Sequence, residues 1–556
     1  MYNYEPRTAL KIVKKLTNQS NVEVVDCQSL RKRAEKYGNR TEFGNYVFIT
    51  NVRNRSAALT VYIGSEKVRL SKLNPRQREI LKELPRTLQE LKGYLEKAPL
   101  VKVEQVMGNN PYYTPHCTLY VSVQRKDSIR IPYMWCNTMF GPRDVPARPA
   151  HQEAGGPARG PRLSIVYIPE WPESKREILV FPEEGVTFVL GSDYFGEAKK
   201  GFLRMAMWFA KKQGMLGIHA GAKVLKARDS SGEVKKYGMF LFGLSATGKT
   251  THACHNHGLT RAGEGVEIVQ DDAVFWRRDG SALGTERGFF IKTDGLDPKS
   301  QPLLYQAATM ADTTFENVTM DSAGRLFFSD DTLTGNGRGI IQMEHFGKFA
   351  GGSINLPSLH QLDGLIIAFI TRRNTVLPIA SRLNPAQAAA AFMLGESIET
   401  SAGDPARAGE SIRVVGTNPF IVGSEAEEGN IFYDFIQRYG DKVKCFLLNT
   451  GGVGEIIKSA ADGTKITERK VNRIEILEMA AVIRGIARGT IQWKEDPYWK
   501  VEVPKYVEGM DIRRFKLEKF YSRRKISSLV KEIKRERIHY LRQFRGLRSG
   551  IIKAVE

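Results

Sequence analysis

An apolar, aromatic-rich run at residues 237–242 leads directly into a G-x-x-x-x-G-K-[ST] loop at residues 243–250, and no other part of the chain constrains its fold as strongly. Glycines in such a loop let consecutive backbone N–H groups turn toward an anion. Lys249 places a positive charge on the outer phosphates, and Thr250 offers its hydroxyl to a divalent cation bound to them. The alternative, a glycine-rich turn between a strand and a helix, leaves the Lys-Thr pair unexplained. The predicted nucleotide-binding residues are Gly243, Leu244, Ser245, Ala246, Thr247, Gly248, Lys249, Thr250 and Thr251.

The composition indicates a globular protein. With 556 residues, 42% of them hydrophobic and 26% charged, the chain is long enough for two or three domains. It has no run of eighteen apolar residues, and its first residues lack the apolar core of a signal peptide, so we expect an intracellular protein without a membrane segment. Its five cysteines are scattered without C-x-x-C spacing, which predicts reduced thiols in the cytoplasm. They are Cys27, Cys117, Cys136, Cys254 and Cys445.

The positive charge of the chain is concentrated at its end. Residues 511–556 hold 15 Lys and Arg against 5 Asp and Glu, which is +10 of the total of +22. Apolar residues at helical spacing between residues 526 and 533 predict a basic amphipathic helix. We expect this helix to pack on the rest of the protein or on a second subunit; the alternative is a surface that binds an acidic partner.

Hydrophobic patterns predict an α/β protein with two domains and a basic helical tail, at residues 1–215, 216–505 and 506–556. The first part has strand patterns at residues 45–50 and 58–63. A helical pattern follows from Ile80 to Leu95, with Pro85 in a position to break or restart it. Residues 143–162 are predicted to form an exposed loop, and the small residues at 401–409 are suited to a mobile lid.

Paired carboxylates follow a strand pattern downstream of the loop. The apolar run 266–270 ends in Asp271 and Asp272. In proteins with this type of loop, an acidic residue at a neighbouring strand end holds the metal ion on the nucleotide phosphates. An Asp-Asp pair alone is weak evidence, and it gains weight only beside the loop.

Two adjacent lysines stand at the start of a predicted helix upstream of the loop. Lys199 and Lys200 precede Phe202, Met205 and Ala206 at helical spacing. The positive end of the helix dipole is expected to lower a lysine pKa and favour a neutral amine there. The alternative is a pair of solvated surface lysines. His219 follows within a largely apolar strand, where a histidine is more often a core residue than a ligand.

These motifs occur in the same order as in phosphoenolpyruvate carboxykinase of the ATP-dependent type, which the chain resembles. The matching features are Y-x-G-E-x-K-K-G at 194–201, His219, the loop at 243–251 and Asp271-Asp272. Weaker similarities follow at 334–339, 377–387 and 445–452, and the Arg-Asn-Arg-Ser segment 53–56 stands where the family carries Gly-Arg-Ser-Pro. The resemblance implies a two-domain carboxykinase fold with the phosphate loop in the C-terminal domain.

The resemblance also implies a reaction, in which oxaloacetate and ATP are converted reversibly to phosphoenolpyruvate, CO2 and ADP, as in gluconeogenesis. By the same resemblance Lys200, His219 and Asp272 would bind a catalytic Mn²⁺, and Thr250 would contact the nucleotide-bound Mg²⁺. A lysine binds metal only as the neutral amine, so the adjacent Lys199 gives a physical reason for this role.

The remaining implied roles concern substrate charge. Arg55 and Arg338 would hold carboxylate and phosphoryl groups, and Tyr194 would contact the substrate carboxyl group or CO2. Lys199 and Lys200 would also contact substrate, and Lys249 would neutralise charge between the β and γ phosphates.

Several positions depart from the family pattern. Ala273 and Val274 follow the Asp pair where the family usually has Glu and His, and Ala246 replaces a usual Gly in the loop. Alternatives therefore include the same fold using GTP, pyrophosphate or another substrate, and a non-catalytic protein that binds polyanions through its basic tail. Nucleic acid is not expected as a partner. The segment 252–257 has the composition of a zinc site, but consecutive positions on the predicted helix would point in different directions.

Overall fold

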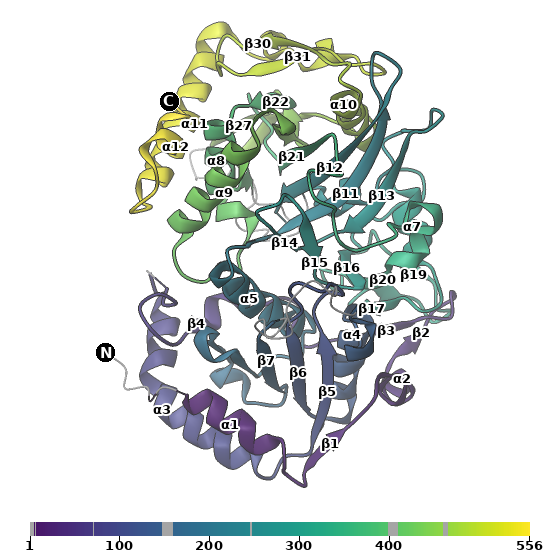
Figure 1. Cartoon of the computed structure of the whole chain (residues 1–556), viewed down its shortest axis with the longest axis vertical. Helices are drawn as coiled ribbons and strands as arrows, with labels where there is room; N and C mark the ends of the chain where they lie inside the picture. The colour runs from purple at the N-terminus through teal and green to yellow at the C-terminus, as the bar shows by residue number, and fades with distance from the viewer. Residues whose placement is uncertain are drawn as a thin grey trace.

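The computed structural model describes residues 5, 7–70, 72–146, 160–244, 247–398, 410–459 and 465–556. It is a mixed α/β structure with several sheets, as the sequence predicts. Figure 1 shows a seven-stranded sheet in the lower half of the molecule and an eight-stranded sheet in the upper half. Within the described residues, no helix is both long and apolar enough to cross a membrane.

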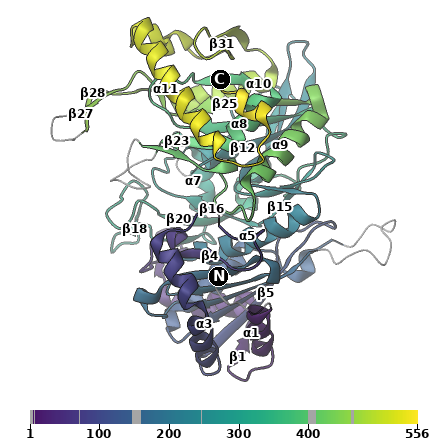
Figure 2. The same ribbon diagram turned by 90° about the vertical axis from the view of Figure 1, so that its left-hand side faces the viewer.

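Helices lie on both sides of the two large sheets (Figures 1 and 2). Their bounds are α1 Thr8–Leu16, α2 Cys27–Ala34, α3 Pro75–Leu95, α4 Arg130–Thr138, α5 Gly196–Lys212, α6 Lys249–Ala253, α7 Pro302–Ala308, α8 Pro385–Leu394, α9 Glu425–Tyr439, α10 Ile476–Arg488, α11 Arg523–Arg542 and α12 Ser549–Lys553.

The seven-stranded sheet has the order β1-β5-β6-β7-β9-β8-β4. Its strands are β1 Val22–Val24, β5 Leu100–Val106, β6 His116–Ser122, β7 Arg162–Ile168, β9 Val186–Leu190, β8 Glu177–Phe181 and β4 Thr60–Tyr62. Both faces are covered: Ile178 and Val180 pack into one hydrophobic cluster, while Leu179 packs into another on the opposite face. This alternation follows from the two-residue period of a strand.

The eight-stranded sheet has the order β13-β11-β12-β21-β25-β22-β31-β30. Its strands are β13 Gly265–Gln270, β11 Ala220–Arg228, β12 Val234–Gly243, β21 Gly364–Thr371, β25 Val443–Asn449, β22 Ala380–Leu383, β31 Glu502–Tyr506 and β30 Gln492–Glu495. Met239 and Leu241 of β12 pack into the cluster that includes α10, whereas Phe240 and Phe242 pack into the cluster that includes α8 and α9. The aromatic run before the loop is therefore a central strand buried on both faces.

A five-stranded sheet joins distant parts of the chain. Its order is β16 Gly288–Lys292, β20 Arg338–Gln342, β17 Thr314–Glu316, β3 Tyr46–Phe48 and β2 Asn39–Arg40. Because β3 pairs in parallel with β17, residues near the N-terminus lie in one sheet with residues from the second half of the chain.

Shorter sheets complete the described part. A three-stranded sheet contains β10 Leu216–Ile218, β14 Val274–Trp276 and β15 Ala282–Gly284. Two-stranded sheets pair β18 Thr319–Met320 with β19 Leu326–Phe327, β23 Glu396–Ile398 with β24 Ser411–Arg413, β26 Gly452–Val453 with β29 Asn472–Arg473, and β27 Ile456–Ser459 with β28 Lys465–Arg469.

Helix α3 confirms the predicted helical pattern but is not interrupted. Asn74 and Gln77 form a capping box, and Pro75 occupies the first turn, where its missing N–H costs nothing. Pro85 lies inside the helix, which continues to Leu95. Buried apolar residues on both sides of Pro85 hold this continuous helix on the sheet. Tertiary packing therefore outweighs the local preference of proline to end a helix.

The basic tail is a packed helix. Ile526, Val530 and Ile533 of α11 are buried in the same cluster as the eight-stranded sheet, which confirms the amphipathic helix and its packing on the protein. Farther along, Arg537 is buried and forms an ion pair with Glu396. Glu396 also accepts ion pairs from Arg373 at 3.4 Å and Arg413 at 3.7 Å. Burial raises the pKa of Glu396, but these three guanidinium groups more than reverse this and lower it to about 2.

The prediction that all cysteines are reduced thiols is wrong for one pair. Cys27 and Cys136 form a disulfide with a Cα–Cα distance of 5.8 Å, and Cys117, Cys254 and Cys445 are free and buried. The two paired residues are separated by 109 positions, so spacing gives no signal for their contact. They meet because α2 packs beside α4.

Several predicted features lie outside the described residues. The lid at 401–409 lies there, as do most of the loop predicted at 143–162 and two residues of the phosphate loop, Ser245 and Ala246.

We expect the disulfide to be detectable and stabilising. Alkylation of the denatured, unreduced protein should modify three cysteines, and alkylation after reduction should modify all five, as counted by mass spectrometry. Cys136→Ser should lower the free energy of unfolding by about 2–4 kcal/mol, because the disulfide closes a long loop in the unfolded chain. Cys445→Ser, which breaks no disulfide, is the control, and five reactive thiols before reduction would contradict the assignment.

The Glu396 ion pairs predict a pH dependence of stability. A carboxyl group with a folded-state pKa of about 2 stabilises the fold fully above its unfolded-state pKa of 4.5, and this stabilisation is lost as the pH falls toward 2. Glu396→Gln should remove it, so the difference in unfolding free energy between wild type and variant should shrink by about 2 kcal/mol between pH 5 and pH 3. Glu502→Gln at an exposed ion pair should show almost no such change.

Candidate functional site

The topology of the eight-stranded sheet brings three predicted residues to one edge. Strand β11 runs antiparallel to both of its neighbours, β12 and β13. The start of β11 therefore lies beside the ends of the other two, with Ala220 opposite Phe242 and Ala222 opposite Gln270. His219 comes immediately before β11, Asp272 follows β13, and Lys249 follows the loop after β12.

The Asp272 carboxylate is the centre of this edge. Its Oδ1 lies 2.9 Å from the Nε2 of His219 and 2.9 Å from the Nζ of Lys249. Its Oδ2 accepts a hydrogen bond of 2.8 Å from Lys199 and also contacts the Nζ of Lys200. Four nitrogen-bearing side chains thus converge on one carboxylate, and Asp272 is only 7% exposed.

Helix α5 supplies both lysines from its first turns. Its apolar residues, including Phe202, Met205 and Ala206, are buried as the helical spacing predicts. The side chain of Lys199 is also buried and forms a second ion pair of 2.9 Å with Glu286. The alternative of two solvated surface lysines is therefore excluded.

Burial and mutual charge set the protonation of the cluster. Burial lowers the pKa of Lys200 to about 7, with a further contribution from Lys199. Burial alone would also lower the pKa of Lys199, but Asp272 and Glu286 raise it above its usual value. A lysine pKa is thus lowered at Lys200, as predicted, with burial rather than the helix dipole as its largest cause.

His219 and Asp272 are also held in the protonation states that bind a metal ion. Burial, followed by the charge of Lys249, lowers the pKa of His219 to about 4, so its ring is neutral at neutral pH. Its Nδ1–H donates to the carbonyl of Thr417 at 2.6 Å, so Nε2 carries the lone pair and accepts a hydrogen bond of 3.0 Å from the Nζ of Lys249. Burial opposes ionisation of Asp272, but the three surrounding lysines hold its pKa well below the usual range.

The donor set of Lys200, His219 and Asp272 fits a divalent metal ion. It offers an amine that loses its proton near neutral pH and a neutral imidazole, each in contact with the same carboxylate. No group of three or more His, Cys, Asp or Glu side chains within the described ranges could hold a metal ion. The candidate set differs from such groups because one of its three donors is a lysine.

The loop between β12 and α6 places Lys249 at this site. Gly248 has a φ of 98°, in the left-handed region that favours glycine, and it directly precedes the first residue of α6. Thr247 closes the turn by donating to the carbonyl of Leu244 at 2.7 Å. Thr251 donates to Gln301 at 2.9 Å, and Thr250 lies half-buried on α6 beside Lys249.

An unpredicted aromatic ring connects Arg55 to the cluster. The guanidinium of Arg55 lies 4.6 Å from the ring centre of Phe420, and the Nζ of Lys200 lies 4.9 Å from it. The His219 ring packs edge-on against the same ring at 5.6 Å. Phe420 thus supports three of the predicted side chains, and nothing in its local sequence indicates this role.

Arg338 and Tyr194 form a second group. Arg338 donates to the side-chain oxygen of Asn336 at 2.6 Å, and the Asn336 amide lies 3.3 Å from the Tyr194 hydroxyl. The same amide donates to the carbonyl of Arg53 at 2.8 Å. The Phe290 ring lies beside both Lys199 and Arg338, each 5.6 Å from its centre, and so connects this group to the Asp272 cluster. Asn336 was not predicted, although it lies within the motif that contains Arg338.

The segment at 252–257 differs from its predicted helical form. Helix α6 ends at Ala253, so only His252 of the three histidines is helical. His252, His255 and His257 instead surround Lys223, whose Nζ donates to the His255 carbonyl at 3.1 Å and contacts the ring of His257. The segment thus surrounds a buried lysine.

Comparison with known proteins assigns the chain to a family. The family model described as phosphoenolpyruvate carboxykinase matches residues 15–513. The chain belongs to the phosphoenolpyruvate carboxykinase family. The match includes every residue of the Asp272 cluster as well as Arg55 and Arg338, and it ends before helix α11.

Curated relatives carry a more specific name. The chain is 32% identical over 368 residues to the phosphoenolpyruvate carboxykinase (ATP) of Aeropyrum pernix, which covers 66% of this chain and 68% of that protein. It is 28% identical to the protein of the same name from Rhizobium etli and 27% identical to that from Rhizobium rhizogenes. These two alignments each cover 63% of this chain and 61% of the relative.

The Lys199–Glu286 pair predicts a coupled loss of stability. Lys199→Met would leave Glu286 and Asp272 buried with one cation fewer, so we expect a clear fall in Tm. Adding Glu286→Gln should recover part of that fall, because the buried carboxylate is removed as well. Lys212→Met, at the exposed end of the same helix, is the control. Strictly additive changes in Tm would show that the two side chains are not coupled.

Proposed function

We propose that this protein is an ATP-dependent phosphoenolpyruvate carboxykinase that converts oxaloacetate and ATP to phosphoenolpyruvate, CO2 and ADP in gluconeogenesis. The observation that carries the proposal is the convergence of Lys199, Lys200, His219 and Lys249 on the Asp272 carboxylate. Membership of the family and the names of the curated relatives support it.

ATP is proposed to bind at the loop after β12. Residues 243–251 would surround its phosphates with backbone N–H groups, and Lys249 would neutralise charge that develops between the β and γ phosphates. The Lys249 amine is held at the centre of the site by its contacts with Asp272 and His219. A glycine-rich turn with only a structural role would not require a lysine amine at this position.

Two divalent cations complete the proposed site. Lys200, His219 and Asp272 would hold Mn²⁺, and Thr250 would contact the Mg²⁺ that accompanies the nucleotide. When bound, these ions would supply charge stabilisation to the enolate oxygen and to the transferring phosphoryl group. The lowered pKa of Lys200, about 7, makes the amine available at little energetic cost.

The chemical steps need positioned charges rather than covalent help from the protein. The C–C bond of oxaloacetate would break with release of CO2, and its electron pair would form the enolate. The enolate oxygen would then attack the γ phosphorus, and ADP would leave. Arg55, Arg338 and Tyr194 would bind the substrate carboxylate and the phosphoryl group, together with Lys199 and Lys200.

The proposal also assigns roles to segments and a location. Residues 1–215 would bind oxaloacetate, residues 216–505 would bind nucleotide and metal, and residues 506–556 would form a basic helical tail. The substrates are small soluble metabolites, so we place the reaction in the cytoplasm.

The test measures phosphoenolpyruvate formation from oxaloacetate with Mn²⁺ and Mg²⁺, and compares ATP, GTP and pyrophosphate as donors. We expect turnover with ATP and a fall in kcat of about 10²–10³-fold in Lys249→Ala, because one charge that stabilises the transition state is lost. Asp272→Asn should abolish turnover and also lower Mn²⁺ affinity, as followed by electron paramagnetic resonance. The metal titration therefore tests the site independently of activity.

Asp363→Asn, in an exposed part of the chain, is the matched control for both measurements. Turnover with GTP or pyrophosphate but not with ATP would overturn the proposed donor. Failure of every donor, with nucleotide binding intact, would overturn the proposed reaction.

A further inference from the structure

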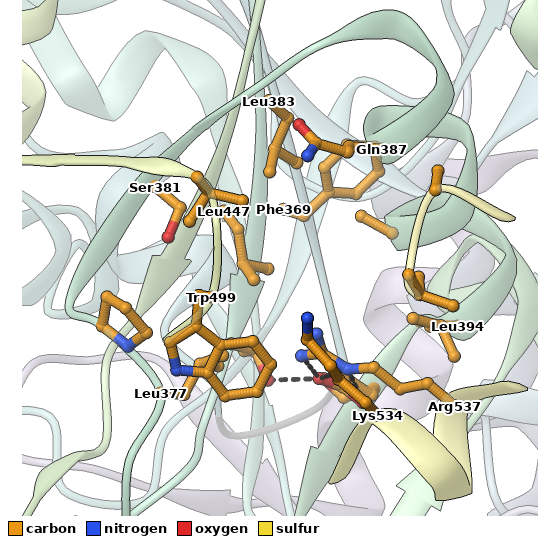
Figure 3. A pocket seen from close by; sticks show the side chains of 18 of the residues that line it. Phe369, Leu377, Ser381, Leu383, Gln387, Leu394, Leu447, Trp499, Lys534 and Arg537 are labelled. Atoms are coloured by element: carbon orange, nitrogen blue, oxygen red, sulfur yellow. Dashed lines mark hydrogen bonds and ion pairs between the residues drawn. The ribbon is translucent and has the colours of Figure 1, made fainter. Parts of the chain in front are cut away.

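A cavity lies between the eight-stranded sheet and the C-terminal helices. Its volume is about 180 Å³, and strands β21, β22 and β25, helix α8, the Trp499 segment and helix α11 contribute to its walls. Figure 3 shows Lys534 and Arg537 at one end, opposite Leu383 and Gln387. The walls between them are mostly apolar and include Phe369, Leu377, Leu394, Leu447 and Trp499.

The cavity is separate from the Asp272 cluster, although two residues lie between them. Thr417 lines the cavity, and its carbonyl accepts the hydrogen bond from His219. Thr371 also lines it, and its carbonyl accepts a hydrogen bond of 2.9 Å from the N–H of Thr450, whose hydroxyl donates to the carbonyl of Thr247, two residues before Lys249, at 2.6 Å. None of the side chains in the Asp272 cluster lines the cavity.

One wall comes from the basic tail. Lys534 and Arg537 of α11 and residues 554–556 line the cavity, and all of them lie beyond residue 513, where the family match ends. This wall is therefore formed by residues outside the part of the chain that matches the family model.

Cations exceed anions around the charged end. Lys500, Lys534 and Arg537 line it, against the carboxylates of Glu396 and Glu556. Glu396 is paired with Arg537 and also with Arg373, which does not line the cavity, so its negative charge is compensated. Arg413, 3.7 Å from Glu396, is itself paired with Glu536 at 2.9 Å. The Nζ of Lys534 lies 2.9 Å from the backbone oxygen of Glu556 and is the least enclosed of the cations on α11 that line the cavity. An anionic group is favoured at this end.

Size limits the rest of the ligand. An apolar cavity of about 150 Å³ can hold benzene, so the present cavity accepts a body of about that size. Trp499 offers a flat face, and the guanidinium of Arg537 already lies 4.9 Å from its ring centre. An aromatic ring would bury apolar surface against Trp499 and the neighbouring leucines.

We propose that this cavity is a second ligand site, which binds a small aromatic or compact aliphatic carboxylate with its apolar body against Trp499 and its carboxylate at Lys534. The site does not depend on the proposed carboxykinase activity, since it shares no ligand-binding side chain with it.

The test uses the full-length protein with benzoate as probe and benzyl alcohol as its neutral counterpart of similar size. Ligand-observed NMR titrations should show saturable binding of benzoate and at least fivefold weaker binding of benzyl alcohol. Lys534→Gln should weaken benzoate about tenfold, to the level of benzyl alcohol, because it removes a charge-assisted contact. Lys531→Gln, exposed on the same helix, should leave binding unchanged.

A cavity-filling variant locates the binding. Ala391 of α8 lines the cavity, and Ala391→Phe should abolish binding of both probes, whereas Ala386→Phe on the same helix should not. Tm and ATP binding of each variant report whether it is folded. Absence of saturable binding, or binding that persists in Ala391→Phe, would overturn the site. Equal affinity for the two probes, or for wild type and Lys534→Gln, would overturn its preference for a carboxylate.

Discussion

The buried carboxylate of Asp272 is the constraint on which the site depends. An isolated carboxylate at this depth would be costly, and so would each of the surrounding lysines. Together they compensate one another: the lysines hold Asp272 ionised, while Asp272 and Glu286 keep Lys199 charged. The compensation is incomplete at Lys200, whose pKa falls to about 7. Burying several charges close together costs free energy, and the same crowding favours the neutral amine of Lys200, which is the form that binds a metal ion.

The position of that carboxylate follows from strand direction. Because β11 is antiparallel to β12 and β13, a residue before one strand meets residues that follow the other two. His219, Lys249 and Asp272 are far apart in the sequence but adjacent at one edge. Helix α5 then adds both lysines from the side, with its apolar face buried against the seven-stranded sheet. The site is consequently built between two sheets, and Phe420 and Phe290 connect its charged groups through their rings.

The basic tail combines a packed face and a charged face in one helix. Residues 511–556 carry much of the net charge, which suggests a polyanion-binding surface. In the fold, one face of α11 completes a hydrophobic core, and Arg537 enters the interior to pair with Glu396. Several cations of this helix remain exposed, so the charge and the packing lie on different faces of one helix. Removing the tail would therefore remove part of the core as well as the charge.

Features that depend on local spacing can be predicted from the amino-acid sequence alone. Four such features are the strand before the loop, the lysines at the start of α5, the Asp pair after β13 and the amphipathic helix α11. Each depends on residues that are close together in the sequence, so the spacing of apolar and charged residues predicts it. The contacts that these elements make with one another depend on the tertiary fold. It joined Cys27 to Cys136, placed β3 beside β17, kept α3 continuous through Pro85 and brought Phe420, Glu286 and Asn336 to the predicted residues. These outcomes depend on contacts between segments far apart in the chain, where packing and burial outweigh local preference and leave no periodic trace in the sequence.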